Sequence, residues 1–178
     1  LVGKLGYPMD SIVTSVKRQL GFAQKHMSHE QQLAVTVALE HFTAILAHQL
    51  LTDERFLAKA PEFVQNLMRW HAIEETEHKA VAFDVYQKVC GDNTLRKRVM
   101  RRATVVFLMR ISWFQLRLLW ADGLPFKPAK LVDYINYLVG VPGFFRKIIP
   151  DYMEFYRDDF HPWQQDNSAL IDSWKERY

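Results

Sequence analysis

The chain has 178 residues, 49% of them hydrophobic and 24% charged, with a formal net charge of +3 at pH 7. These values are ordinary for one soluble globular domain, and the charge is too small to indicate a nucleic-acid partner. A single cysteine, Cys90, excludes an intrachain disulfide framework and any multi-cysteine metal site, and it fits a reducing compartment such as the cytoplasm. No secretory signal pattern is recognisable. The longest apolar run, near residues 105–120, is interrupted by Arg110 and Arg117, so we expect no ordinary membrane span.

Two helices are expected in the first third of the chain. The first begins at a cap formed by residues 10–11 and is expected to be interrupted near Gly21. The second begins at Ser28, because Ser28 and Gln31 have the spacing of a capping box, in which two side chains satisfy free amides at a helix start. This second helix should run over about residues 29–52.

Glu40 is the one formally charged residue between Glu30 and Asp53, in the middle of the second helix. It shares an apolar stripe with Leu33, Val37, Ala44, Ala47 and Leu51. A buried carboxylate must be protonated, paired with a cation or bound to a metal. The alternative is a glutamate on a narrow polar strip that also holds His41 and His48.

The third helix carries the strongest functional pattern. We expect it to run over residues 61–90 and to be ended by Gly91. Within it, His71, Glu75 and His78 recur at i, i+4 and i+7, so their side chains fall within a sector of about 60°. Apolar residues share this sector, which is therefore expected to face a core: Val64, Met68, Ala82 and Val85. Two imidazoles and a carboxylate converging in a core indicate a metal site, and the alternative is a helix whose histidines are hydrogen-bonded inside the core. Other charged residues nearby are expected to be solvated: Glu74, Glu77 and Lys79.

The next helix, from Thr94 to about Gly123, joins a basic start to an apolar and aromatic remainder. The basic turns hold Arg96, Lys97, Arg98, Arg101 and Arg102. We favour a bundle helix with a solvated basic end, because a large core also needs the aromatic residues. The alternative is an amphipathic segment at a membrane surface, with basic turns on anionic headgroups and aromatic residues in the interface: Phe107, Trp113, Phe114 and Trp120.

The rest of the chain is expected to form short helices. One covers residues 129–139, a pair of short helices follows and ends near Arg157, and a last helix covers about residues 168–175. Between them, Phe160 and Trp163 are expected to pack a turn around His161. His161 next to acidic residues also fits a metal ligand, and we favour the turn. No strand, internal repeat or low-complexity segment is expected.

Glu40, His71, Glu75 and His78 together offer two carboxylates and two imidazoles. This set suits iron, manganese or zinc, with iron favoured, and is poor for copper(I) or calcium. A dinuclear site in a helical bundle takes a second set of one Glu and one Glu-x-x-His, and the sequence contains no further Glu-x-x-His. The site is therefore mononuclear, or its other half lies outside this chain, or a second copy supplies that half in a homodimer.

Four stretches of sequence carry a family resemblance: LGYPMDSI, ALEHFTAILA, WHAIEETEHKAVAFDVY and FHPW. Over essentially its whole length the chain resembles the bacterial family of predicted metal-dependent hydrolases, which implies a ferritin-like fold. Glu40, Glu75 and His78 match the second half-site of that family. The family's LGYP is preceded by further helices that carry a Glu and a Glu-x-x-His-type motif, so the resemblance, with Leu1 as first residue, implies loss of an N-terminal part. The spacing of His71, Glu75 and His78 is also similar, locally, to di-iron N-oxygenases that act on aminoarenes, in which the extra histidine is a ligand.

We therefore expect an all-α, partial ferritin-like helical bundle over residues 1–123 that bears a metal half-site, with a C-terminal helical extension over residues 124–178. The expected function is metal-dependent catalysis on a small apolar organic substrate, by O₂-dependent oxidation, which we favour, or by hydrolysis with metal-activated water. No catalytic residue is identified beyond the metal ligands. The alternative is a metal-free helical interaction or membrane-surface module on a degenerate enzyme scaffold. The expected location is cytoplasmic, with membrane association under the alternative.

Overall fold

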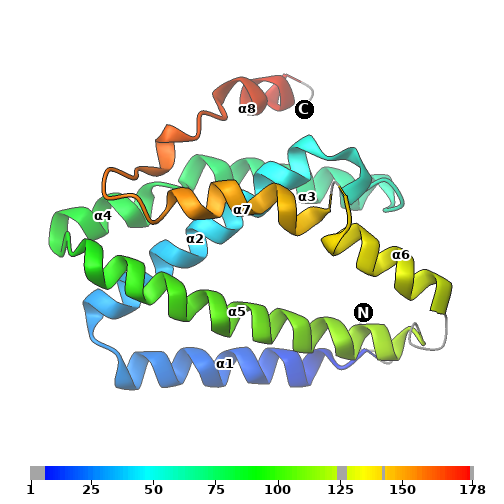
Figure 1. Cartoon of the computed structure of the whole chain (residues 1–178), viewed down its shortest axis with the longest axis horizontal. Helices are drawn as coiled ribbons and strands as arrows, with labels where there is room; N and C mark the ends of the chain where they lie inside the picture. The colour runs from blue at the N-terminus through cyan, green and yellow to red at the C-terminus, as the bar shows by residue number, and fades with distance from the viewer. Residues whose placement is uncertain (1–6, 124–127, 142, 177–178) are drawn as a thin grey trace.

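The structure is a computed structural model that describes residues 7–123, 128–141 and 143–176. Over these ranges the chain is all-α, as predicted, and contains no strand (Figure 1). The helices are α1 (Met9–His26), α2 (His29–Thr52), α3 (Glu62–His78), α4 (Val81–Val89), α5 (Asn93–Ala121), α6 (Pro128–Val139), α7 (Phe144–Glu154) and α8 (Ser168–Lys175). Short 3₁₀ turns lie at Glu54–Phe56 and Pro162–Gln164. The predicted pair of short helices before Arg157 is wrong, because α7 is a single helix.

The central helix is α2, and its predicted bounds are confirmed. The Ser28 hydroxyl accepts the Gln31 N–H at 3.3 Å, and the Gln31 side chain accepts the Ser28 N–H at 3.2 Å, so the capping box sets the helix start. α2 packs against α3, α4, α5 and α7. Many of its buried residues are small, which lets these neighbours approach closely: Ala34, Ala38, Ala44 and Ala47.

The main core lies where α2, α4, α5 and the segment after α7 meet. Its buried members are Ala34, Val37, Ala38, Ala82, Phe83, Tyr86, Val99, Met100, Phe155 and Phe160. Arg96 lies within this core and is fully buried, so the predicted solvated basic end is wrong for Arg96. The prediction is confirmed for the exposed side chains that follow it: Arg98, Arg101 and Arg102. The carboxylate of Asp92, and not Thr94, caps α5 by accepting the N–H groups of Thr94 and Leu95 at 2.8 and 3.0 Å.

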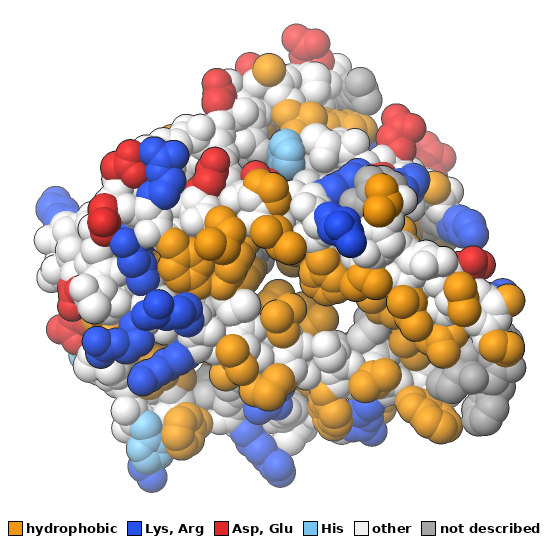
Figure 2. Space-filling view, viewed as in Figure 1, with side chains coloured by type: hydrophobic (Ala, Val, Ile, Leu, Met, Phe, Trp, Pro, Cys, Tyr) orange, Lys and Arg blue, Asp and Glu red, His pale blue; other side chains and the backbone are white. Residues whose placement is uncertain are grey.

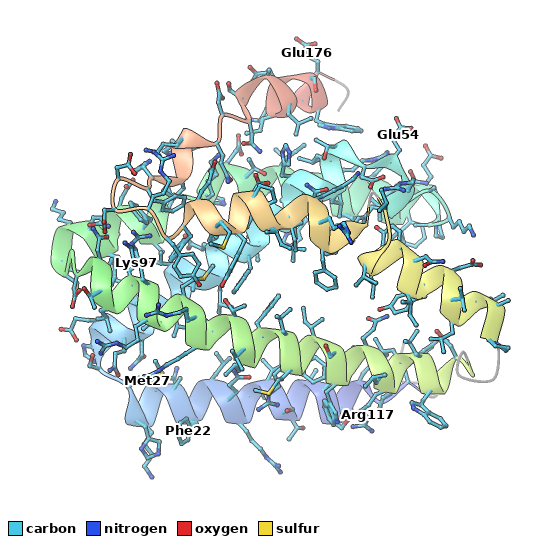
Figure 3. All side chains as sticks on the ribbon, in the orientation of Figure 1. Phe22, Met27, Glu54, Lys97, Arg117 and Glu176 are labelled. Carbon is cyan, nitrogen blue, oxygen red and sulfur yellow. The ribbon has the colours of Figure 1, made fainter. Side chains whose placement is uncertain are left out.

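α1 and α5 lie side by side and antiparallel along one edge of the molecule (Figure 1). α1 has no buried residue, and Gly21 lies inside it without interrupting it. Two arginines of α5 connect the helices. Arg117, labelled in Figure 3, donates to the Ser11 hydroxyl at 2.7 Å. Arg110 donates to the hydroxyl of Ser15. The outer side of α1 therefore stays apolar and exposed, at Val13, Val16, Leu20 and Phe22.

Among the described helices, α2 and α5 have the length and apolar composition of a membrane-crossing helix. Half of the apolar window in α2 is buried, as in the core helix of a soluble protein, whereas only 6% of the window in α5 is buried. By length and composition alone, α5 therefore meets the criterion, and the expectation of no membrane span stays a prediction. Arg110 and Arg117 interrupt its apolar run, but both side chains reach back to α1.

Candidate metal centre

The predicted single helix over residues 61–90 is wrong, because the chain turns at Lys79 and Ala80 between α3 and α4. The N–H of Ala82 would bond the His78 carbonyl in a continuous helix. It instead donates to Glu40 Oε2 of α2 at 3.1 Å. Lys79, expected to be solvated, is only 4% exposed, and its ammonium donates to the Gln165 carbonyl and to Asn167. The break therefore places the end of α3 and the start of α4 against Glu40.

Glu40 lies close to two of the predicted ligands. Burial raises the pKa of Glu40 above its ordinary value of 4.5, while the hydrogen bond from Ala82 lowers it. The negative charge of Glu75 raises this pKa further, and the positive form of His78 lowers it. Glu40, Glu75 and His78, from two different helices, are thus near enough for their charges to interact.

His71 joins the group through Glu75. Its Nε2 atom lies 3.6 Å from Glu75 Oε1, one helical turn away, with side-chain exposures of 56% and 30%. His71 therefore lies beside Glu75, and the charges of Glu75 and His78 act on the pKa of Glu40.

The expectation that this sector faces a core is wrong for the described chain. His71, His78 and Val85 are exposed, and only Ala82 is buried, with Val64 and Met68 half-buried. The reason is that α3 buries a different side against its neighbours, about 100° or more around the helix: Ala72, Ile73 and Thr76. Exposed apolar side chains also occur on α3 and α4, at Phe63, Leu67, Trp70, Val81 and Val85.

The donor types of this group fit a metal ion, but the described residues contain no cluster of three or more His, Cys, Asp or Glu side chains already arranged around one point. A cation between Glu40 and Glu75 would remove the repulsion that raises the pKa of Glu40. For His71 and His78 to bind the same ion as the two carboxylates, their side chains must adopt new rotamers. Exposed side chains change rotamer within nanoseconds. The chemistry of the donor set is therefore suitable, and its final geometry depends on the ion.

The polar strip proposed as an alternative for Glu40 is not formed, because His41 and His48 face the C-terminal segment. His48 Nδ1 lies 3.1 Å from the Asn167 amide. The His41 ring packs against Phe155 and Phe160 with centroid distances of 4.9 and 5.2 Å. Its Nε2 atom is buried without a hydrogen-bond partner.

His161 forms the predicted turn. Its Nδ1 atom accepts the N–H of Trp163 at 3.2 Å, and Phe160 is buried. Its Nε2 atom lies 2.9 Å from a carboxylate oxygen of Asp84.

Sequence reasoning missed Lys79 and the Ala82 amide, which shape the centre. The helix break that frees this amide is not marked by a proline or glycine, since residues 79–82 are Lys-Ala-Val-Ala. No local signal was available.

Acid is expected to destabilise the protein through His41. Burial, together with the charges of Arg96 and Lys79, lowers the pKa of His41 to about 4, against an opposing hydrogen bond to the Asp151 backbone. Between pH 6.5 and pH 4 the unfolded chain binds this proton and the folded chain does not, so stability falls as the pH falls. The total loss is about 3 kcal/mol.

Chemical denaturation at a series of pH values measures this effect. The His41→Phe variant, which keeps a ring against Phe155 and Phe160, should lose most of the slope between pH 6.5 and pH 4. The exposed His29 supplies the control, because His29→Phe should leave the slope as it is. An unchanged slope in His41→Phe would exclude His41 as its origin.

Comparison with protein families finds a match to the model described as "Predicted metal-dependent hydrolase", over residues 1–166. Comparisons with curated proteins and with solved structures found no match.

Proposed function

Because the chain belongs to the predicted metal-dependent hydrolase family, we propose that it is a hydrolase whose metal ion is held by Glu40, Glu75 and His78, with His71 as a fourth ligand. The observation that carries this proposal is that Glu40 of α2 accepts the Ala82 N–H at the junction of α3 and α4, where the charges of Glu75 and His78 act on its pKa. Convergence of a carboxylate from one helix with a Glu-x-x-His pair from the next is the half-site of carboxylate-bridged bundle proteins. The family description supports the metal and the reaction class, and the positions of the ligands rest on this geometry.

Each residue of the group has a distinct part. The Ala82 N–H holds one oxygen of Glu40 in place, which fixes the carboxylate toward α3. Glu75 provides the second negative charge, and His71 and His78 provide neutral nitrogen donors from a surface where they can turn. Iron, manganese and zinc suit such a set, and iron is our first choice. When bound, such an ion supplies a Lewis acid and lowers the pKa of water, which suits hydrolysis of an ester or amide in a small organic substrate.

We also propose that a second helix pair covers this centre, in a ferritin-like arrangement completed by a homodimer. Exposed apolar side chains on α3 and α4 include Trp70, Val81 and Val85. An apolar surface of this kind marks a protein contact. Light scattering on the metal-loaded protein measures its mass, and a monomer that retains full metal would exclude the homodimer.

Metal-dependent ester hydrolysis by the purified chain tests the function. Metal is removed with a chelator and restored one ion at a time, and p-nitrophenyl esters of short carboxylic acids serve as probes. Restored metal should restore hydrolysis, and Glu75→Gln should lower the rate by about 100-fold or more, because it removes one charged ligand. Glu62→Gln, an exposed glutamate in the first turn of α3, should match the wild type.

The same experiment distinguishes hydrolysis from O₂-dependent oxidation. Stoichiometric iron with O₂ consumption, and no hydrolysis of esters or amides, would favour the oxidative reaction over the hydrolytic one. Equal rates in Glu75→Gln and Glu62→Gln would remove Glu75 from the site.

A membrane-surface role is the second candidate function, because one observation favours it. The window of α5 that is apolar enough to cross a membrane is almost unburied, and it follows the exposed basic side chains of Arg98, Arg101 and Arg102. Flotation with anionic vesicles tests it. A chain that binds vesicles tightly and holds no metal would support this role in place of the hydrolase, at a cytoplasmic membrane surface.

A further inference from the structure

A large apolar cavity lies between α2, α5, α6 and α7. Its volume is about 710 Å³, and its lining comes from these helices and the 3₁₀ turn at Glu54–Phe56. None of the lining residues is charged. Figure 2 shows the molecule hollowed between α5 and α7, with hydrophobic side chains at the rim. Cavities that hold small molecules in proteins are of this size and character.

The cavity is separate from the proposed metal ligands. On α2 it is lined by Phe42, Ile45 and Leu46. At 100° per residue these side chains project from the side of α2 opposite Glu40. Whatever occupies the cavity is therefore not positioned for reaction at Glu40, and a role for the cavity does not depend on the hydrolase function.

The lining is long and mostly hydrocarbon. Its residues on α5 extend from Thr104 to Leu119, which spans about 22 Å at 1.5 Å per residue. Across from α5 the wall is formed by side chains of α7 such as Ile148 and Tyr152. An apolar space of this length can hold an extended hydrocarbon chain.

One end of the cavity is polar, and a positive charge lies near it. The Thr104 hydroxyl lies 2.9 Å from the Tyr152 hydroxyl, which lies 2.6 Å from the Tyr156 hydroxyl. Arg101 precedes Thr104 by three residues, on the same side of α5, and its charge acts on Tyr156. Its side chain is exposed, and no acidic residue occurs in α5.

We propose that this cavity binds a long-chain fatty acid, with the hydrocarbon chain along α5 and the carboxylate at Arg101, Thr104 and Tyr152. The apolar walls favour transfer of the chain out of water, in proportion to the area removed from solvent. The positive charge near the polar end selects a carboxylate over a neutral head.

Binding of cis-parinaric acid, whose fluorescence rises when it leaves water, tests the site in the full chain. The wild type should bind the probe, and Leu108→Trp should weaken binding by about tenfold or more by filling the cavity. Met109→Trp is the matched control, because Met109 is the next residue of α5, is 61% exposed and does not line the cavity. If Leu108→Trp does not fold, Ile148→Trp fills the same space from α7.

Competition with unlabelled ligands tests the charged end. Palmitic acid should displace the probe better than hexadecanol, and Arg101→Gln should remove that preference by weakening palmitic acid about tenfold. Binding should persist in Glu75→Gln and after chelation, so loss of the hydrolase activity leaves this result intact. Equal probe binding by Leu108→Trp and wild type would overturn the proposal. The proposal would also be overturned if the probe fluorescence rose only when the fatty acid was presented in anionic vesicles.

Discussion

The His78→Ala variant is expected to bind metal at least about 100-fold more weakly than the wild type, because it removes one of the ligands that we propose for the metal ion. His78 is exposed at the end of α3, so the substitution should leave the fold unchanged. Elemental analysis after dialysis measures the bound metal, and near-stoichiometric iron, manganese or zinc is expected in the wild type.

The control for this variant is another exposed histidine. His29→Ala, at the start of α2, should keep the wild-type metal content. Equal metal in His78→Ala and His29→Ala would remove His78 from the centre. If the wild-type chain held no metal, the role of Glu40 would be structural: its carboxylate accepts the Ala82 N–H at the start of α4.

Replacing Arg96 with leucine should cause the largest loss of stability. The guanidinium of Arg96 is fully buried and donates to the carbonyls of Phe155 and Arg157 and to the Asn93 side chain. It also lies over the Phe155 ring, 4.7 Å from the centroid. Leucine would leave two backbone carbonyls without a donor in or near the core, and we expect a loss of about 3 to 5 kcal/mol in the free energy of unfolding.

Urea denaturation of Arg96→Leu measures this loss, with Arg98→Leu as the control. Arg98 is exposed two residues further along α5, and its replacement should change stability by less than about 0.5 kcal/mol. Arg96→Lys should fall between the two, because an ammonium cannot reproduce the paired donors of a guanidinium. Equal midpoints for Arg96→Leu and Arg98→Leu would show that the hydrogen bonds to the segment after α7 do not stabilise the fold.

Several features were predictable from the sequence because short-range interactions set them. The bounds of α2 follow from the capping box of Ser28 and Gln31, and the end of α4 follows from Gly91, which has a φ of +64°. A partner for Glu40 was also predictable in kind, since a lone carboxylate on an apolar stripe requires one, and the Ala82 N–H is such a partner.

The rest was decided by contacts between residues far apart in the chain. Helical periodicity places His71 and His78 on one side of α3, but it does not state whether that side meets a core or solvent. The same limit explains why the burial of Arg96 was not predicted. In the sequence Arg96 is one of five basic residues, and it is buried because Phe155 and Arg157 lie beside it in the fold. The sequence by itself determined the all-α class and the bounds of α2. Only the tertiary structure decided which helix faces are covered, because burial depends on distant partners and not on local hydrogen bonds.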